Sequence, residues 1–202
     1  MRVAPPGWSA LNAPHRKESN VSPVSDIPIA CQTITFGPEQ KEHFAAVFDA
    51  VAAAGYDGVE IGFRHIADTP PETLRAMLAE RGLVLAASHV GGNLEDTGQA
   101  EAERGLLDDV LDYLRRTDTK LLMYSGLRFE SDDQLRRDLE MLHRSAERCL
   151  AAGVQLLYHN HNWEFADGGR VFNALIDYES DAVGLCPDLG WLVKGGQDVL
   201  AL

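Results

Sequence analysis

The sequence predicts an α/β fold of the (β/α)8 TIM-barrel type, truncated after about six βα units. From residue 29 onward, apolar runs of strand length alternate with longer stretches of helical spacing, and this strict alternation indicates a parallel sheet with helical crossovers. Polar side chains stand where the apolar runs end, among them Glu60, His89, His159 and Asp188. In a barrel those strand ends form one rim, which carries the active site.

The predicted elements follow one another in a regular order. The sequence predicts strands at 29–35, 57–62, 84–89, 119–124, 154–159 and 182–187. It predicts helices at 39–54, 71–81, 101–116, 131–152 and 171–179, and a last helix that starts near residue 197. Each strand rests on a short run of consecutive apolar residues, and the helices rest on apolar residues three and four positions apart.

Local signals mark where the helices end or begin. Gly55, Gly82 and Gly153 follow predicted helices, at the position where a left-handed residue ends a helix and glycine is favoured. Ser131 and Gln134 together fit a capping box at the start of the helix that follows the fourth strand.

Two parallel architectures are compatible with this order, an open doubly wound sheet and a barrel. No GxGxxG motif follows the first strand, where a dinucleotide-binding fold would need one. On the second strand Glu60 shares one face with two glycines, while Val59 and Ile61 take the other face. A face of small and polar residues suits a barrel lumen with a site, so we predict the barrel; an open six-stranded sheet is the alternative.

The predicted βα units occupy only part of the chain, which we therefore divide into a barrel domain and an N-terminal extension. About six strands are predicted, whereas a closed barrel has eight, so residues 28–202 are expected to form a barrel domain that is incomplete at its C-terminus. Residues 1–27 are rich in Pro, Ser and Asn and have no periodicity. We expect them to form a disordered N-terminal extension.

Composition limits the partners that the protein is expected to bind and the compartment in which it is expected to be found. The formal net charge of −13 disfavours nucleic acid and anionic membranes as partners. No apolar run is long enough to span a bilayer, and the start of the chain has no apolar leader segment. Three widely spaced cysteines, Cys31, Cys149 and Cys186, fit buried free thiols in a reducing compartment. We expect a cytoplasmic protein, with a tendency to form homo-oligomers through the exposed edges of an unclosed barrel.

The octapeptide from Tyr158 to Phe165 (YHNHNWEF) is the strongest chemical signal. His159 and His161 are two positions apart on an extended segment, so their side chains point the same way. An imidazole pair at a strand end can bind a divalent metal or polarise a carbonyl group. Glu164 is a candidate acid/base, or a group that orients a histidine. The alternative is a polar barrel mouth whose side chains only stabilise their own loop by hydrogen bonds.

Other rim candidates come from the remaining strands. Asp188, in the segment CPDLGW, is a candidate metal ligand, with a helix N-cap as the alternative. Trp191 is a candidate for stacking on a sugar ring, or a packed aromatic residue. Glu60 and His89 occupy inward strand-end positions, whereas His65 is expected in a loop.

GYDGVEIG, YHNHNWEF and CPDLGW, in this order and spacing, resemble the sugar phosphate isomerase/epimerase superfamily of xylose isomerase-like barrels, inosose dehydratases included. The resemblance covers roughly residues 29–202. It implies a barrel with a divalent metal (Mn²⁺, Mg²⁺ or Co²⁺) at strand-end carboxylates and a histidine. It implies proton abstraction next to the carbonyl of a sugar or keto-polyol, catalysed by an isomerase, an epimerase or a dehydratase.

Residue by residue, the resemblance makes Asp188 and His159 metal ligands, and Glu60, His159 and Glu164 candidate catalytic residues. His89, His161 and Trp191 are expected to bind substrate. His159 departs from the family pattern, because ketose epimerases have a metal-binding glutamate there. The ligands of the seventh and eighth strands have no counterpart, so we expect weak metal binding.

Two alternatives to a sugar isomerase, epimerase or dehydratase remain. A truncated barrel fragment without catalysis fits the missing strands. An endonuclease IV-like nuclease is a remote alternative, because it would need a basic surface that binds DNA and more zinc ligands.

Overall fold

A computed structural model of the chain describes residues 27–91, 100–178 and 181–200. The N-terminal extension predicted at 1–27 lies outside the described residues, except for its last residue. The described residues form one parallel sheet of six strands, which are β1 (Ala30–Gln32), β2 (Gly58–Gly62), β3 (Val84–Gly91), β4 (Leu121–Ser125), β5 (Gln155–His159) and β6 (Val183–Cys186).

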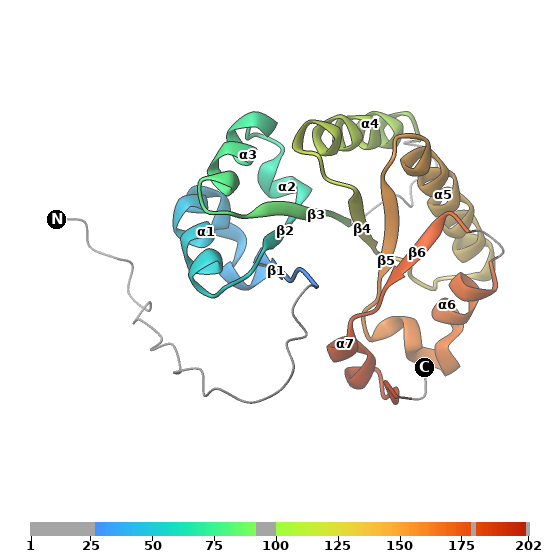
Figure 1. Cartoon of the computed structure of the whole chain (residues 1–202). Helices are drawn as coiled ribbons and strands as arrows, with labels where there is room; N and C mark the ends of the chain where they lie inside the picture. Colours follow the sequence, from blue (N-terminus) through green and yellow to red (C-terminus); the bar gives the residue numbers. More distant parts are fainter. Residues whose placement is uncertain (1–26, 92–99, 179–180, 201–202) are drawn as a thin grey trace.

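The strand order distinguishes the two architectures. Neighbouring strands are consecutive in the chain, in the order β1-β2-β3-β4-β5-β6, and every pair is parallel. A doubly wound sheet would reverse its order at one strand. With right-handed crossovers throughout, all helices cover the same face and the other face curls around a lumen. Figure 1 shows the helices outside the curved sheet, so the predicted barrel-type fold is confirmed.

Seven helices and three 3-10 turns connect the strands in the described residues. The helices are α1 (Phe44–Ala53), α2 (Phe63–Ile66), α3 (Pro71–Ala79), α4 (Ala100–Thr117), α5 (Asp132–Ala151), α6 (Ala166–Asp177) and α7 (Leu189–Lys194). The 3-10 turns are η1 (Thr33–Phe36), η2 (Pro38–Glu42) and η4 (Trp163–Phe165).

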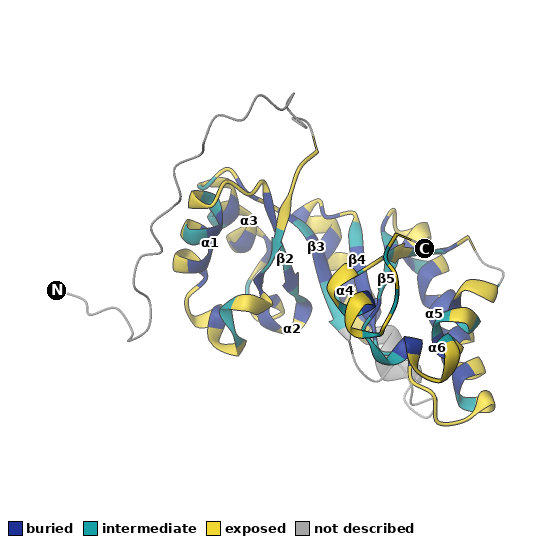
Figure 2. Cartoon of the chain, turned by 90° about the horizontal axis from the view of Figure 1, so that it is seen from below, coloured by how far each residue is buried: buried dark blue, intermediate teal, exposed yellow. Residues whose placement is uncertain are grey.

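The core lies between the sheet and its helices. Val59 and Ile61 of β2 are fully buried, as are Phe48 of α1 and Leu142 of α5. Glu60, between the two buried residues, is half-buried on the opposite face, as the alternation predicted. Figure 2 shows the same pattern, with buried residues on the inner sides of the helices and exposed residues on their outer sides.

Most predicted helix ends are confirmed. Gly55, Gly82 and Gly153 have φ values of 84°, 69° and 75°, in the left-handed region that side chains disfavour. The backbone N–H of Gln134 donates to the Ser131 hydroxyl over 3.2 Å, which is the predicted N-cap. The reciprocal bond differs from the capping box, because the Gln134 side chain accepts from the backbone of Glu130.

Two predicted elements are shorter than expected. The first strand ends at Gln32, because Thr33 turns into η1 and its hydroxyl donates to the backbone carbonyl of Glu60. The helix predicted at 39–54 is divided at His43, whose φ of −134° separates η2 from α1.

The helix predicted near residue 197 was wrong. Asp188 caps α7 by accepting the backbone N–H of Trp191 over 2.8 Å, so the helix starts at Leu189. It ends before Gly195, and Gly196 has a φ of 78°. His65 was also misplaced, because it lies in the short helix α2 and is buried.

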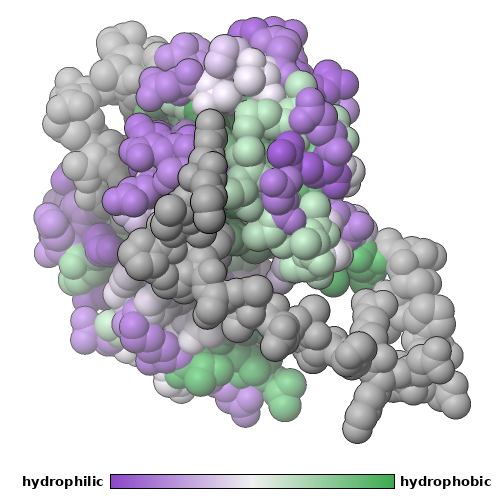
Figure 3. All heavy atoms as spheres, turned by 90° about the vertical axis from the view of Figure 1, so that its left-hand side faces the viewer, coloured by the Kyte–Doolittle hydropathy of each residue, from purple (hydrophilic) through white to green (hydrophobic). Residues whose placement is uncertain are grey.

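The surface of this fold is mixed in character. Figure 3, viewed from the side of α1 and α3, shows hydrophilic residues interleaved with weakly hydrophobic ones, and strongly hydrophobic residues at the lower edge of the view. The exposed residues of α1 include Ala45 and Ala46. None of the described helices is long and apolar enough to cross a membrane. Cys31, Cys149 and Cys186 are free thiols, as predicted, but Cys149 alone is buried, whereas Cys31 and Cys186 are partly exposed.

Candidate active site at the carboxyl ends of the strands

Three imidazoles form a row at the carboxyl ends of β3 and β5. The ring centroids of His89 and His159 are 5.9 Å apart, and those of His159 and His161 are 5.0 Å apart. His89 is near the end of β3 and His159 ends β5. Because the strands are parallel, their carboxyl ends lie at the same edge of the sheet, and both histidines are found there. The structure therefore brings together three of the histidines that the sequence singled out.

The surroundings of His89 keep it uncharged at neutral pH. Its Nε2 lies 3.0 Å from the Ser125 hydroxyl at the end of β4. Burial, and then the neighbouring His159, His161 and Arg64, lower the pKa of His89 to about 4. A neutral imidazole both donates and accepts a hydrogen bond, so His89 is suited to bind a substrate hydroxyl or carbonyl.

Asp188 faces the middle of the histidine row. Its Oδ2 is 3.9 Å from Nε2 of His159, while its Oδ1 caps α7. Asn160, which is buried, holds the Asp188 backbone: it accepts from the backbone N–H over 2.8 Å and donates to the carbonyl over 3.3 Å. Asp188 is therefore both the helix cap and the partner of His159.

Glu164 lies behind the row. It is fully buried, and its Oε1 accepts from the Tyr158 hydroxyl over 2.8 Å. Its Oε2 accepts from the backbone N–H of His161 over 2.9 Å. Because both carboxylate oxygens are already bonded within the protein, the geometry favours the orienting role for Glu164 over the acid/base role.

Aromatic and cationic side chains form the side of the site near α7. The His161 ring stacks on Trp163 with centroids 4.0 Å apart and lies 5.2 Å from Trp191. The Arg128 guanidinium sits 3.4 Å from the centre of Trp163, and Lys194 sits 4.2 Å from the centre of Trp191. Burial, His159 and Arg128 lower the pKa of His161 to about 4, against the opposing effect of the Asp188 carboxylate.

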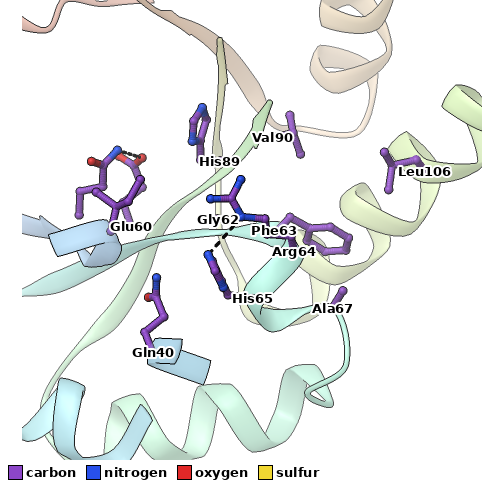
Figure 4. A pocket seen from close by; sticks show the side chains of 12 residues that line it. Gln40, Glu60, Gly62, Phe63, Arg64, His65, Ala67, His89, Val90 and Leu106 are labelled. Carbon is purple, nitrogen blue, oxygen red and sulfur yellow. Dashed lines mark hydrogen bonds between the residues drawn. The ribbon is translucent and has the colours of Figure 1, made fainter. Parts of the chain in front are cut away.

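Glu60 joins the site from β2. Its Oε1 accepts from the Gln32 amide over 2.9 Å, and it lines a cavity of about 240 Å³ together with His89 (Figure 4). Burial, then Glu60 and Asp188, raise the pKa of the Cys186 thiol at the end of β6. Glu60 and His89 line this cavity, His89 faces His159, and His159 faces Asp188. The four residues therefore form a chain of neighbours along the carboxyl ends of the strands.

The donor types of the facing pair fit a divalent cation in part. An imidazole nitrogen and a carboxylate oxygen are ligands that Mn²⁺ and Co²⁺ accept. Yet within residues 27–91, 100–178 and 181–200 no group of three or more His, Cys, Asp or Glu side chains could hold a metal ion. The described residues therefore offer two donors of a suitable type, His159 and Asp188, and no complete metal site.

Several residues of the site escaped sequence reasoning. Asn160 and Trp163 lie inside the octapeptide that was singled out, but their partners, Asp188 and Leu127, lie in the segments that follow β6 and β4. Ser125 and Gln32 gave no signal of their own, because each acts through one hydrogen bond across the sheet. Their position at a predicted strand end was the available hint.

Comparisons with known proteins agree with this geometry. Residues 48–202 match the sequence family described as the xylose isomerase-like TIM barrel. The chain belongs to that family. An inosose dehydratase of Lacticaseibacillus casei is 27% identical over 176 residues, which cover 79% of this chain and 58% of that protein. The chain thus spans little more than half the length of this xylose isomerase-like relative.

Solved structures of the xylose isomerase-like fold are also similar. A sugar phosphate isomerase/epimerase from Parabacteroides distasonis superposes with a TM-score of 0.76 at 22% identity, covering 91% of this chain and 72% of that one. A xylose isomerase-like protein from Mycobacterium smegmatis, in complex with magnesium, has a TM-score of 0.68 at 20% identity, with coverages of 85% and 67%. At these identities the likeness concerns the fold.

Proposed function

We propose that this chain carries the substrate-binding and proton-transfer residues of a sugar isomerase, epimerase or dehydratase. The substrate is a sugar or keto-polyol, and the reaction starts with removal of a proton from the carbon next to its carbonyl group. The observation that supports this proposal is the chain of neighbours at the carboxyl ends of the strands, in which Glu60 and His89 line one cavity, His89 faces His159 and His159 faces Asp188.

Each side chain has a role in this proposal. Glu60 and His159 are the candidate proton-transfer groups, since a positioned carboxylate or imidazole can exchange a proton with carbon. His89 and His161, both neutral at pH 7, hydrogen-bond the substrate oxygens, and Trp191 covers one face of the sugar. Glu164 positions His161 through the backbone bond described above.

A divalent cation, Mn²⁺, Mg²⁺ or Co²⁺, is part of the proposal. His159 and Asp188 would hold it, and when bound it polarises the substrate carbonyl. A cation on Nε2 of His159 would take that nitrogen out of proton transfer and leave this task to Glu60. With two donors from the described residues, binding is expected to be weak.

Deuterium exchange tests the reaction without assuming the product. The chain is incubated in D₂O with free ketoses and keto-inositols, with and without Mn²⁺, and ¹H NMR follows the carbon next to the carbonyl. We expect exchange at that carbon, reduced about 100-fold in Glu60→Gln, the scale of general acid–base catalysis. The matched control is Glu140→Gln, the same substitution at an exposed position of α5.

The contrary outcome is equally clear. No exchange above the protein-free blank with any substrate would contradict the enzymatic proposal. If sugar binding persisted in that case, the non-catalytic barrel fragment would be the better description.

A further inference from the structure

The His161 imidazole lacks the hydrogen bond that usually orients a histidine in a site. Its Nδ1 is buried and has no hydrogen-bond partner within the described part of the chain. Glu164 accepts only from the backbone N–H of this residue and leaves its ring unbonded. Functional histidines are commonly oriented through a hydrogen bond of their second ring nitrogen, so a different contact must fix the plane of this ring.

The indole of Trp163 supplies that contact. The two rings are almost parallel, at 12°, with centroids 4.0 Å apart. The indole is itself held at its edge, because its Nε1 donates to the backbone carbonyl of Leu127 over 3.2 Å. His159 and Trp191 meet the imidazole at steeper angles, 90° and 47°, so among the described rings only Trp163 lies flat against it.

Arg128, the residue after Leu127, covers the opposite face of the indole. Its guanidinium carbon is 3.4 Å from the centre of the Trp163 ring. The guanidinium and the imidazole cannot share one face of the indole, because at these two distances their atoms would overlap. Trp163 is therefore held between Arg128 and His161 in a three-layer stack.

The contact with Trp163 is the one that holds the Arg128 side chain. Arg128 is exposed and forms no ion pair among the residues that the structure describes, whereas Arg170, over the ring of Phe129, also pairs with Asp132. A guanidinium is attracted by the negative face of an indole and stacks on it. This attraction restricts movement of the indole away from the imidazole on its other side.

We propose that Arg128 is a positioning residue of the proposed reaction, which acts through Trp163 to fix the His161 imidazole in the orientation that binds substrate. With Nδ1 buried, Nε2 is the ring nitrogen left for a substrate oxygen. Such a bond is directional and lies in the plane of the ring, so a tilted imidazole would misdirect it. The inference rests on the proposed function, in which His161 hydrogen-bonds the substrate.

NMR of the histidine-labelled chain without substrate gives the first test. The stacked indole shifts the ring protons of His161 upfield. We expect Arg128→Met, which removes the cation and keeps an unbranched side chain, to reduce this shift and to leave the resonances of His89 unchanged. Arg128→Lys should lie closer to wild type, because an ammonium group is also attracted by the indole face. The matched control is Arg137→Met, at an exposed position of α5, which should match wild type.

Deuterium exchange of D-fructose and of a keto-inositol gives the second test. We expect Arg128→Met to raise KM about two- to fivefold, the factor that an exposed cation–π contact contributes. The kcat should stay nearly unchanged, because His161 binds a substrate oxygen in the ground state and the transition state alike. A purely structural role of Arg128 would not divide the effect in this way.

Three results would overturn the inference. Identical His161 resonances in Arg128→Met and wild type would show that Arg128 does not hold the stack. Equal changes in Arg128→Met and Arg137→Met would show a general effect of lost surface charge. A changed His161 ring with an unchanged KM would show that the stack has no part in substrate binding.

Failure of this inference is distinguishable from failure of the proposed function. No exchange by the wild-type chain would end both the proposed function and this role of Arg128. Unchanged His161 resonances in Arg128→Met, together with exchange by the wild-type chain, would end the inference alone.

Discussion

His89 at the carboxyl end of β3 and His143 on α5 are both histidines whose pKa is lowered by burial, yet their surroundings differ. His89 is bonded to Ser125, faces the His159 ring and lines a cavity. His143 is 6% exposed and stacks on Tyr178 at 4.0 Å, and its two ring nitrogens have no hydrogen-bond partner in the described residues.

The difference distinguishes the candidate site at the rim from a structural region around α5. At the rim, polar groups from different strands meet one another, as His159 meets Asp188. Around α5, the ring of His143 packs as an aromatic group against the segment that precedes β6. Burial and a lowered pKa occur in both regions. Convergence of side chains from several strand ends is therefore the better sign of a site.

The largest expected effect concerns the rim. His159→Ala should lower the rate of deuterium exchange about 100-fold or more, because it removes both a proton-transfer group and the partner of Asp188. His143→Phe, which keeps an aromatic ring on Tyr178, should leave that rate unchanged. A rate that falls equally in both variants would erase the distinction between the two regions.

The second effect concerns the support of the histidine row. Glu164→Gln should lower the free energy of unfolding by about 1–3 kcal/mol, because an amide N–H₂ would face a donor, either the Tyr158 hydroxyl or the backbone of His161. The exposed Glu140→Gln should change it by less than about 0.5 kcal/mol. Urea unfolding of both variants gives the comparison, and equal stabilities would contradict the bonded role of Glu164.

The third effect is a pH dependence of stability, which we expect from His143 in the structural region around α5. The pKa of His143 is lowered in the folded chain, so the unfolded chain binds the proton more readily and stability decreases as the pH falls below about 6.5. The charged and titratable neighbours are Glu140, Arg144, Glu147, Tyr178 and Asp181.

Removing the titrating group should therefore flatten this dependence. His143→Phe should lose less stability than wild type between pH 7.5 and pH 5, as measured by thermal unfolding at both values. It should also be more stable at pH 7.5, since two unbonded buried nitrogens are removed. A variant with the same loss on acidification as wild type would show that His143 does not titrate on unfolding.

The smallest effect is expected from metal. With two donors, His159 and Asp188, Mn²⁺ at micromolar concentration should not move the Tm, and millimolar Mn²⁺ should raise it slightly through weak binding to the folded state. His159→Ala should abolish the millimolar effect. A large upward shift at micromolar Mn²⁺ would mean that further ligands join the pair.

The sequence was sufficient for the order of strands and helices, since hydrophobic period and glycine positions are local signals. The residues of the rim could be predicted because the carboxyl ends of parallel strands lie at the same edge of the sheet. The partners were not predictable. Asn160 was visible only as one residue of a polar segment, but its bonds reach the backbone of Asp188, the N-cap of α7.

The most direct test of the account is a titration of the ¹⁵N-histidine-labelled chain with a keto-polyol, followed by NMR of the imidazole resonances. The account predicts that His89, His159 and His161 shift together with one apparent Kd, while His143 does not shift. Separate Kd values for the three rim histidines, or a shift of His143 as large as theirs, would contradict a single site at the carboxyl ends of the strands.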